Sequence, residues 1–242
     1  MNRPEHPGHL IPIPDVQGGV DDRDIAIDQV GIKGLRYPVP FVDRDGAVHS
    51  TIATCNVYVA LPADRKGTHM SRLVGLLEDR AAAGAKPVSV ASLREWLDDL
   101  LARLEAPGGR IELAFPFFVR KIAPVSGVPS LLDYDVRLEA DLTDGVFTSA
   151  AMVSVPVTSL CPCSKEISDY GAHNQRSLVT IGVRPREPVF LAELLRIAEE
   201  EASAELYGVL KRVDEKYVTE RAYDNPRFVE DLVRGVAQKL AA

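Results

Sequence analysis

The sequence predicts an α+β fold in which an antiparallel sheet carries paired helices on one face. Two observations predict it. Segments that alternate apolar and polar residues, typical of half-buried strands, occur in consecutive pairs. Segments with an apolar period of 3.6 residues, typical of amphipathic helices, occur between them. The order strand, strand, helix, helix, strand, strand then begins again, which predicts two tandem modules, although the two halves share no residue-level repeat.

The first module is expected over residues 30–143, after an irregular arm at 1–29 that is rich in Pro, Gly and Asp. Ser92 is a candidate N-cap for its second helix. Cys55 in a strand and Trp96 on an apolar helix face are expected in the core. The expected elements are strands at 30–39, 50–61, 110–119 and 131–141, and helices at 70–77 and 93–101.

The second module is expected over residues 144–242. Alternation predicts strands at 146–159 and 177–183, and the 3.6-residue period predicts one helix over 191–213. The acidic run at 199–201 is interpreted as a solvated face of that helix. A last helix is expected to start with Asn225 as its cap and Pro226 at its first position.

Composition excludes several classes of protein. Thirty-five acidic against 28 basic residues give a net charge of −7, which argues against a protein that grips long nucleic acids. No stretch approaches the ~20 uncharged apolar residues of a membrane span, and the N-terminus lacks the apolar core of a secretory signal. We therefore expect a cytoplasmic protein with neither a nucleic-acid nor a membrane partner.

Reactive side chains concentrate in residues 159–177, between two predicted strands. Cys161 and His173 could meet at a divalent ion, and one carboxylate would complete a three-ligand site. Lys165 near Cys163 would favour the thiolate of that residue. The alternative is that the cysteines are small buried residues and His173 is a hydrogen-bonded surface residue. The sequence has only three cysteines, which excludes a four-cysteine structural zinc site.

The segments Cys-Pro-Cys-Ser-Lys-Glu-Ile-Ser at 161–168 and Gly-Ala-His-Asn-Gln-Arg-Ser at 171–177 resemble the signature of type IB GTP cyclohydrolase I. Further segments that resemble this family lie at 15–17, 30–38, 66–72, 214–223 and 228–231. The resemblance implies the tunnelling fold, with two tandem modules per subunit and a homotetramer. It also implies a hydrolase that converts GTP and water to 7,8-dihydroneopterin triphosphate and formate, for folate, pterin or 7-deazaguanine synthesis.

The resemblance also implies roles for individual residues. Cys161, His173 and Glu215 would bind the catalytic metal, which this ligand set allows to be zinc, manganese or iron. Cys163 would be a second catalytic thiol, and Glu230 would bind the guanine ring, although alone it is typical of a first-turn glutamate. The candidates for binding the triphosphate are Lys66, His69, Arg72, Lys165 and Arg176.

One departure from the family affects the expected activity. Members continue past the last helix into two strands with a His-Asn-His segment, and the five histidines of this sequence, at 6, 9, 49, 69 and 173, include no counterpart. The second module is thus expected to lack its last two strands. Two alternatives stay open: another tunnelling-fold enzyme such as a nitrile reductase, or a catalytically impaired form that binds metal or GTP.

Overall fold

The computed structural model describes residues 15–187 and 189–241, and it contains one seven-stranded antiparallel sheet. Six strands follow one another across the sheet in chain order, and the short β7 pairs with β5. The predicted antiparallel α+β architecture is therefore confirmed. The strands are β1 (Ile27–Val42), β2 (Val48–Leu61), β3 (Gly109–Ile122), β4 (Pro129–Thr143), β5 (Val146–Leu160), β6 (Asn174–Val183) and β7 (Ala204–Glu205).

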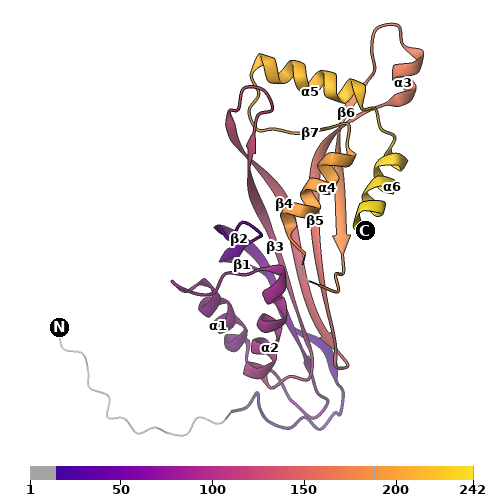
Figure 1. Cartoon of the computed structure of the whole chain (residues 1–242). Helices are drawn as coiled ribbons and strands as arrows, with labels where there is room; N and C mark the ends of the chain where they lie inside the picture. The colour runs from indigo at the N-terminus through magenta and orange to yellow at the C-terminus, as the bar shows by residue number, and fades with distance from the viewer. Residues whose placement is uncertain (1–14, 188, 242) are drawn as a thin grey trace, which may run out of the picture.

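The helices cover one face of the long, twisted sheet in two groups (Figure 1). One group lies along the half of the sheet that holds β1 and β2, and the other surrounds the opposite end of β5 and β6. The first group is α1 (Met70–Ala81), a 3₁₀ turn (Val90–Ser92) and α2 (Leu93–Leu104); the second is α3 (Pro162–Ile167), α4 (Leu191–Glu201), α5 (Arg212–Asp224) and α6 (Val229–Leu240).

The main hydrophobic core runs beneath both helix groups, and a second, small cluster of Leu160, Ala204 and Ala222 joins β5, β7 and α5. The inward residues of β4 alternate with exposed ones, as the period of a strand requires, and Leu138 is fully buried against the helices. Cys55 and Trp96 are both in this core, as predicted. The two halves of the chain share the sheet, because β4 and β5 pair through a tight turn at Asp144 and Gly145, both with positive φ.

The helix predicted over 191–213 is wrong in its second half, since α4 ends at Glu201. The chain leaves the helix because Ser203 pairs with the end of β5: its amide donates to the carbonyl of Thr158, and its hydroxyl accepts from the amide of Leu160. β7 follows, and a separate helix, α5, begins at Arg212. Pairing to a neighbouring strand thus overrides a continuing apolar period.

The predicted start of the last helix is also wrong. Asn225 follows the last residue of α5, where its side-chain amide donates to the carbonyl of Ala202, and α6 begins only at Val229. Residues 162–167, expected as a loop, form α3, with Pro162 in its first turn. No helix in the described ranges is long and apolar enough to cross a membrane.

Candidate functional site

The structure brings Cys161 and His173 together at one end of the sheet. β5 and β6 pair up to Leu160 and Asn174, so the residues that follow and precede them are neighbours. The amide of Cys161 donates to the carbonyl of His173 at 3.2 Å. Ser164 in α3 links the two: its hydroxyl donates to the carbonyl of Cys161 and accepts from the amide of His173, each at 3.0 Å.

The Cys161 side chain sits where backbone N–H groups favour its ionised form. The amide of Ser164 is the main cause that lowers the pKa of the Cys161 thiol, and the amide of Cys163 adds to it, while partial burial acts in the opposite direction. Cys163 itself is exposed. Cys55 differs in both respects, because burial in the core raises its pKa to about 11. The thiols that solvent or a ligand can reach are therefore those at α3.

The side chain of Lys165 contacts α5. Its ammonium donates to the carbonyl of Tyr223 at 2.5 Å and lies 4.1 Å from the centre of the Tyr223 ring. The expectation that Lys165 acts on the Cys163 thiol therefore has no support in the contacts of its ammonium group. The contact does join α3 to the last turn of α5.

Glu215 is exposed in the first turn of α5, eight residues before Tyr223. Eight residues of α-helix span about 12 Å, so Glu215 lies far from the end of α5 that contacts α3. Within residues 15–187 and 189–241, no three His, Cys, Asp or Glu side chains form a group that could hold a metal ion. The set of a thiol, an imidazole and a carboxylate suits zinc or a neighbouring transition metal, but one chain brings only the first two together.

Glu230 and Arg176 lie in the same half of the molecule as α3. Glu230 is exposed at the second position of α6. Arg176 is exposed on β6, opposite Thr158 of β5, two positions after Asn174, which begins the strand. Both side chains are therefore free to contact a ligand in solution.

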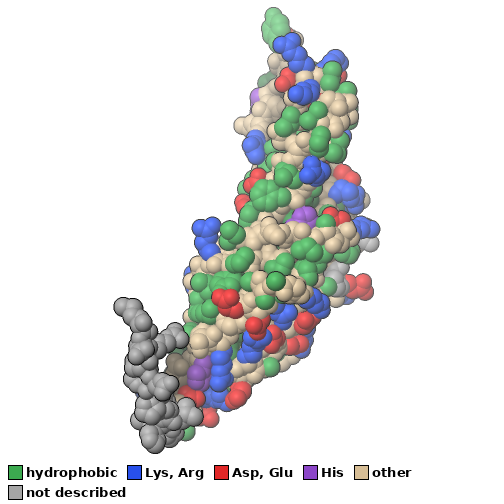
Figure 2. Space-filling view, turned by 90° about the vertical axis from the view of Figure 1, so that its left-hand side faces the viewer, with side chains coloured by type: hydrophobic (Ala, Val, Ile, Leu, Met, Phe, Trp, Pro, Cys, Tyr) green, Lys and Arg blue, Asp and Glu red, His purple; other side chains and the backbone are tan. Residues whose placement is uncertain are grey.

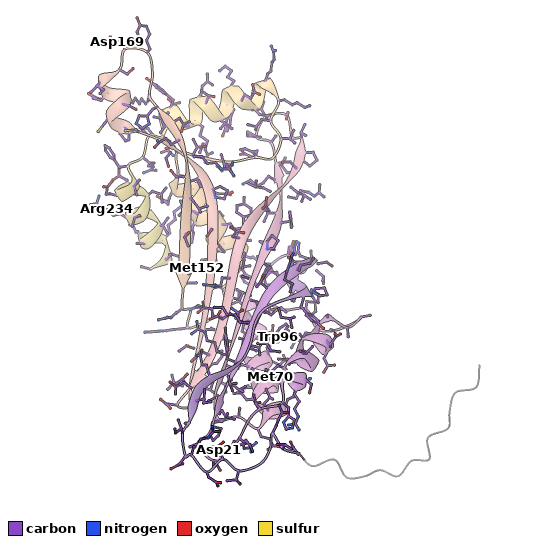
Figure 3. All side chains as sticks on the ribbon, turned by 180° about the vertical axis from the view of Figure 1, so that it is seen from behind. Asp21, Met70, Trp96, Met152, Asp169 and Arg234 are labelled. Carbon is purple, nitrogen blue, oxygen red and sulfur yellow. The ribbon has the colours of Figure 1, made fainter. Side chains whose placement is uncertain are left out.

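The remaining candidates lie at the other end of the molecule. His69 precedes α1 and its Nε2 is 3.0 Å from a carboxylate oxygen of Asp15, while Arg72 donates to the carbonyl of Arg103. Both line a cavity of about 290 Å³, and the exposed Lys66 adjoins it in the chain. Figure 3 shows the separation: Met70, at the start of α1, and Asp169, just after α3, are far apart along the sheet.

Asp214 is a further candidate functional residue, and its sequence neighbourhood alone does not reveal it. It is fully buried, next to the exposed Glu215, and its carboxylate joins α5 to the loop between β3 and β4. The one local signal is its position three residues after Lys211, where an acidic residue commonly caps a helix. That signal gives no indication of the distant loop.

Comparisons with known proteins agree on one family. Residues 13–242 match the family model described as type I GTP cyclohydrolase FolE2. The chain is 56% identical to GTP cyclohydrolase FolE2 1 of Dechloromonas aromatica over 243 residues, which cover 99% of this chain and 88% of that protein. It is 57% identical to FolE2 2 of Cupriavidus metallidurans (95% and 84% covered) and 58% identical to FolE2 of Paraburkholderia phymatum (94% and 84% covered).

Proposed function

The chain belongs to the type I GTP cyclohydrolase FolE2 family, and from this premise we propose that it hydrolyses GTP to 7,8-dihydroneopterin triphosphate and formate. This reaction is the first step of folate and pterin synthesis, and it also supplies 7-deazaguanine nucleosides of tRNA. The observation that carries the proposal is the hydrogen-bonded Cys161, Ser164 and His173 unit, in a chain that matches the family over nearly all its length.

A divalent metal would be held by Cys161 and His173 together with Glu215, which the assembly has to bring to them because one chain alone does not. The lowered pKa of the Cys161 thiol supports this ligand set, because a metal binds the thiolate form. When bound, such an ion polarises the substrate and lowers the pKa of water. Zinc, manganese and iron all accept this set of ligands, and supply in the cell often decides among them.

The other residues bind GTP and move protons. Cys163 is exposed two residues from Cys161, where its thiol can exchange protons with the purine as the imidazole ring opens. Glu230 accepts the ring N1–H and the exocyclic amino group of guanine with its two carboxylate oxygens. The triphosphate is bound by cationic side chains chosen from Lys66, His69, Arg72, Lys165 and Arg176.

The active enzyme is a homotetramer with sites near its subunit interfaces. Support comes from the distance between the two groups of candidates: Cys161 and His173 lie at one end of the chain, and His69 and Arg72 lie at the other. Hydrophobic side chains also lie along the surface seen in Figure 2, and contiguous exposed hydrophobic surface is typical of protein–protein contacts. Independently of that view, the exposed large hydrophobic residues of the described chain include Ile52, Phe118, Ile122, Leu131 and Leu178.

Each subunit of this assembly consists of the tandem modules 30–143 and 144–242. The order of elements supports this division, because the strand pair β1–β2 precedes α1 and α2, and the strand pair β5–β6 precedes α4 and α5. The sheet continues from one module to the next through β4 and β5. Both modules therefore contribute to one layer of strands and one core.

Metal removal tests the proposed function. Protein stripped of metal is expected to release no formate from GTP, and to release formate and a fluorescent dihydropterin after zinc or manganese is restored. A C161S variant, which keeps the size of the side chain, is expected to stay inactive with either metal. Undiminished activity under chelation would contradict the metal site, and oxidation of NADPH with a deazaguanine nitrile would favour the nitrile reductase alternative. Tight binding of GTP without formate would indicate a binding protein instead.

A further inference from the structure

Asp214 makes four hydrogen bonds although its side chain is fully buried. One carboxylate oxygen accepts from the amides of Val125 and Ser126, at 2.9 and 2.8 Å. The other accepts from the hydroxyl of Ser126 at 2.6 Å and from the amide of Lys211 at 2.8 Å. The carboxylate therefore connects the first turn of α5 to a loop that lies 88 residues earlier in the chain.

All four donors reach the two oxygens of a carboxylate that is buried from water. A charge in this position is stable only while its donors stay in place. The contact is thus specific in geometry, and a carboxamide cannot reproduce it, because an asparagine has one acceptor oxygen for four donors.

Two further contacts hold the segment before α5 against the same pair of strands. Lys121, near the end of β3, donates to Glu199 of α4 and to Glu205 of β7. Gly208 lies so close to the carbonyl of Leu131 in β4 that an added Cβ would be 2.7 Å from that oxygen. Figure 1 shows the result, with α5 lying across the end of the sheet.

Asp214 and Glu215 then point in different directions for a simple reason. Successive residues of an α-helix are about 100° apart around its axis. With Asp214 bonded into the protein, Glu215 faces out, and it is exposed. Any rotation or fraying of the first turn of α5 would move the Glu215 carboxylate with it.

We propose that Asp214 is a positioning residue: it fixes the first turn of α5 on the β3–β4 loop and so sets the direction in which the Glu215 carboxylate faces out of the subunit. In that direction Glu215 is presented to the metal of Cys161 and His173, a contact that one chain alone does not make. The inference rests on the proposed function, because it takes Glu215 as a metal ligand. A residue that orients a ligand typically changes metal affinity by 10- to 100-fold when it is replaced.

Zinc affinity of the metal-free full-length chain tests the proposal, measured by competition with a chelating dye at a fixed subunit concentration. D214N is expected to weaken zinc binding by roughly 10- to 100-fold. S126A removes one of the four hydrogen bonds and is expected to have a smaller effect in the same direction. E220Q, on the exposed surface of the same helix, is the control and is expected to bind zinc normally. Thermal unfolding of each metal-free variant checks that it folds.

The double variant D214N/E215Q separates positioning from a general structural role. If Asp214 acts through Glu215, the double variant binds zinc as E215Q does, because the ligand to be positioned is already lost. The proposal would be overturned if the loss of zinc affinity in the double variant equalled the product of the losses in D214N and E215Q. It would also be overturned if D214N bound zinc normally while E215Q bound it more weakly. Should D214N fail to fold, normal zinc binding by S126A decides against the proposal. Normal zinc binding by E215Q would instead reject Glu215 as a ligand, and the proposal with it.

Discussion

At the scale of single residues, the least expected feature of this protein is a largely buried glutamate, Glu199. Glu199 was expected on a solvated face with Glu200 and Glu201, but its side chain is only 13% exposed. It accepts from the hydroxyl of Tyr134 at 2.7 Å and from Lys121 at 2.8 Å, and Lys121 also donates to Glu205. Burial raises the pKa of Glu199, so its charge depends on the single ammonium between the two carboxylates.

Replacing Lys121 by methionine therefore leaves two half-buried or buried carboxylates without their cation. We expect K121M to lower the free energy of unfolding by about 3–5 kcal/mol, as for other buried ion pairs that lose one partner. The control is K216M, which breaks an exposed pair with Glu220 and should change the free energy by less than about 1 kcal/mol. Urea denaturation at one fixed subunit concentration measures both, and equal effects would contradict the burial argument.

At the scale of elements, the strands and the first two helices follow from local pattern, and the segment after α4 does not. Leu206, Val209 and Leu210 continue the 3.6-residue period, yet Val209 is 41% exposed and none of the three is helical. β7 pairs with β5 instead, and the chain passes over β4 at Gly208. Backbone hydrogen bonds to a strand that is already in place outweigh the weak preference for a longer helix.

Two glycine-to-alanine variants test this packing. G208A is expected to lower the free energy of unfolding by about 1–3 kcal/mol, because its Cβ would overlap the carbonyl of Leu131. G75A in α1 meets no atom within 4 Å and should raise it by up to about 1 kcal/mol, since alanine favours the helix. Urea denaturation measures the free energy of unfolding of both variants, and their comparison removes the effect that any glycine-to-alanine change has on the unfolded chain. An unchanged free energy of unfolding in G208A would contradict the close contact with Leu131.

At the scale of the whole molecule, the proposed metal ligands Cys161 and His173 lie at one end of the sheet, and some of the residues proposed to bind the triphosphate lie at the other end. Cys161 and His173 belong to one chain segment and come together within it. Lys66 and Arg72 lie near α1, at the other end of the sheet. A site that uses both ends must therefore take them from two copies, and this arrangement can be tested by mixing subunits.

Mixed tetramers of C161S and K66A/R72A subunits are expected to regain activity, although each variant alone is inactive. If a site takes one end from each of two subunits, a random equal mixture should show about a quarter of wild-type formate release. Mixtures of C161S and H173A are the control and should stay inactive, because both side chains come from the same subunit. Absence of recovery in the first mixture, or activity of K66A/R72A alone, would contradict the shared site.

The sequence by itself determined the alternation of strands, the two helices predicted at 70–77 and 93–101, and the core positions of Cys55 and Trp96, and it placed Cys161 and His173 in one connection between two predicted strands. These depend on the period of one element or on a short connection between paired strands, so the signal is local. The end of α4, the burial of Glu199 and the three hydrogen bonds that Asp214 accepts from the β3–β4 loop were decided only by the tertiary structure. Each depends on groups about 40 to 90 residues apart, and a lone acidic residue in a sequence is the same whether its partners are water or a distant loop.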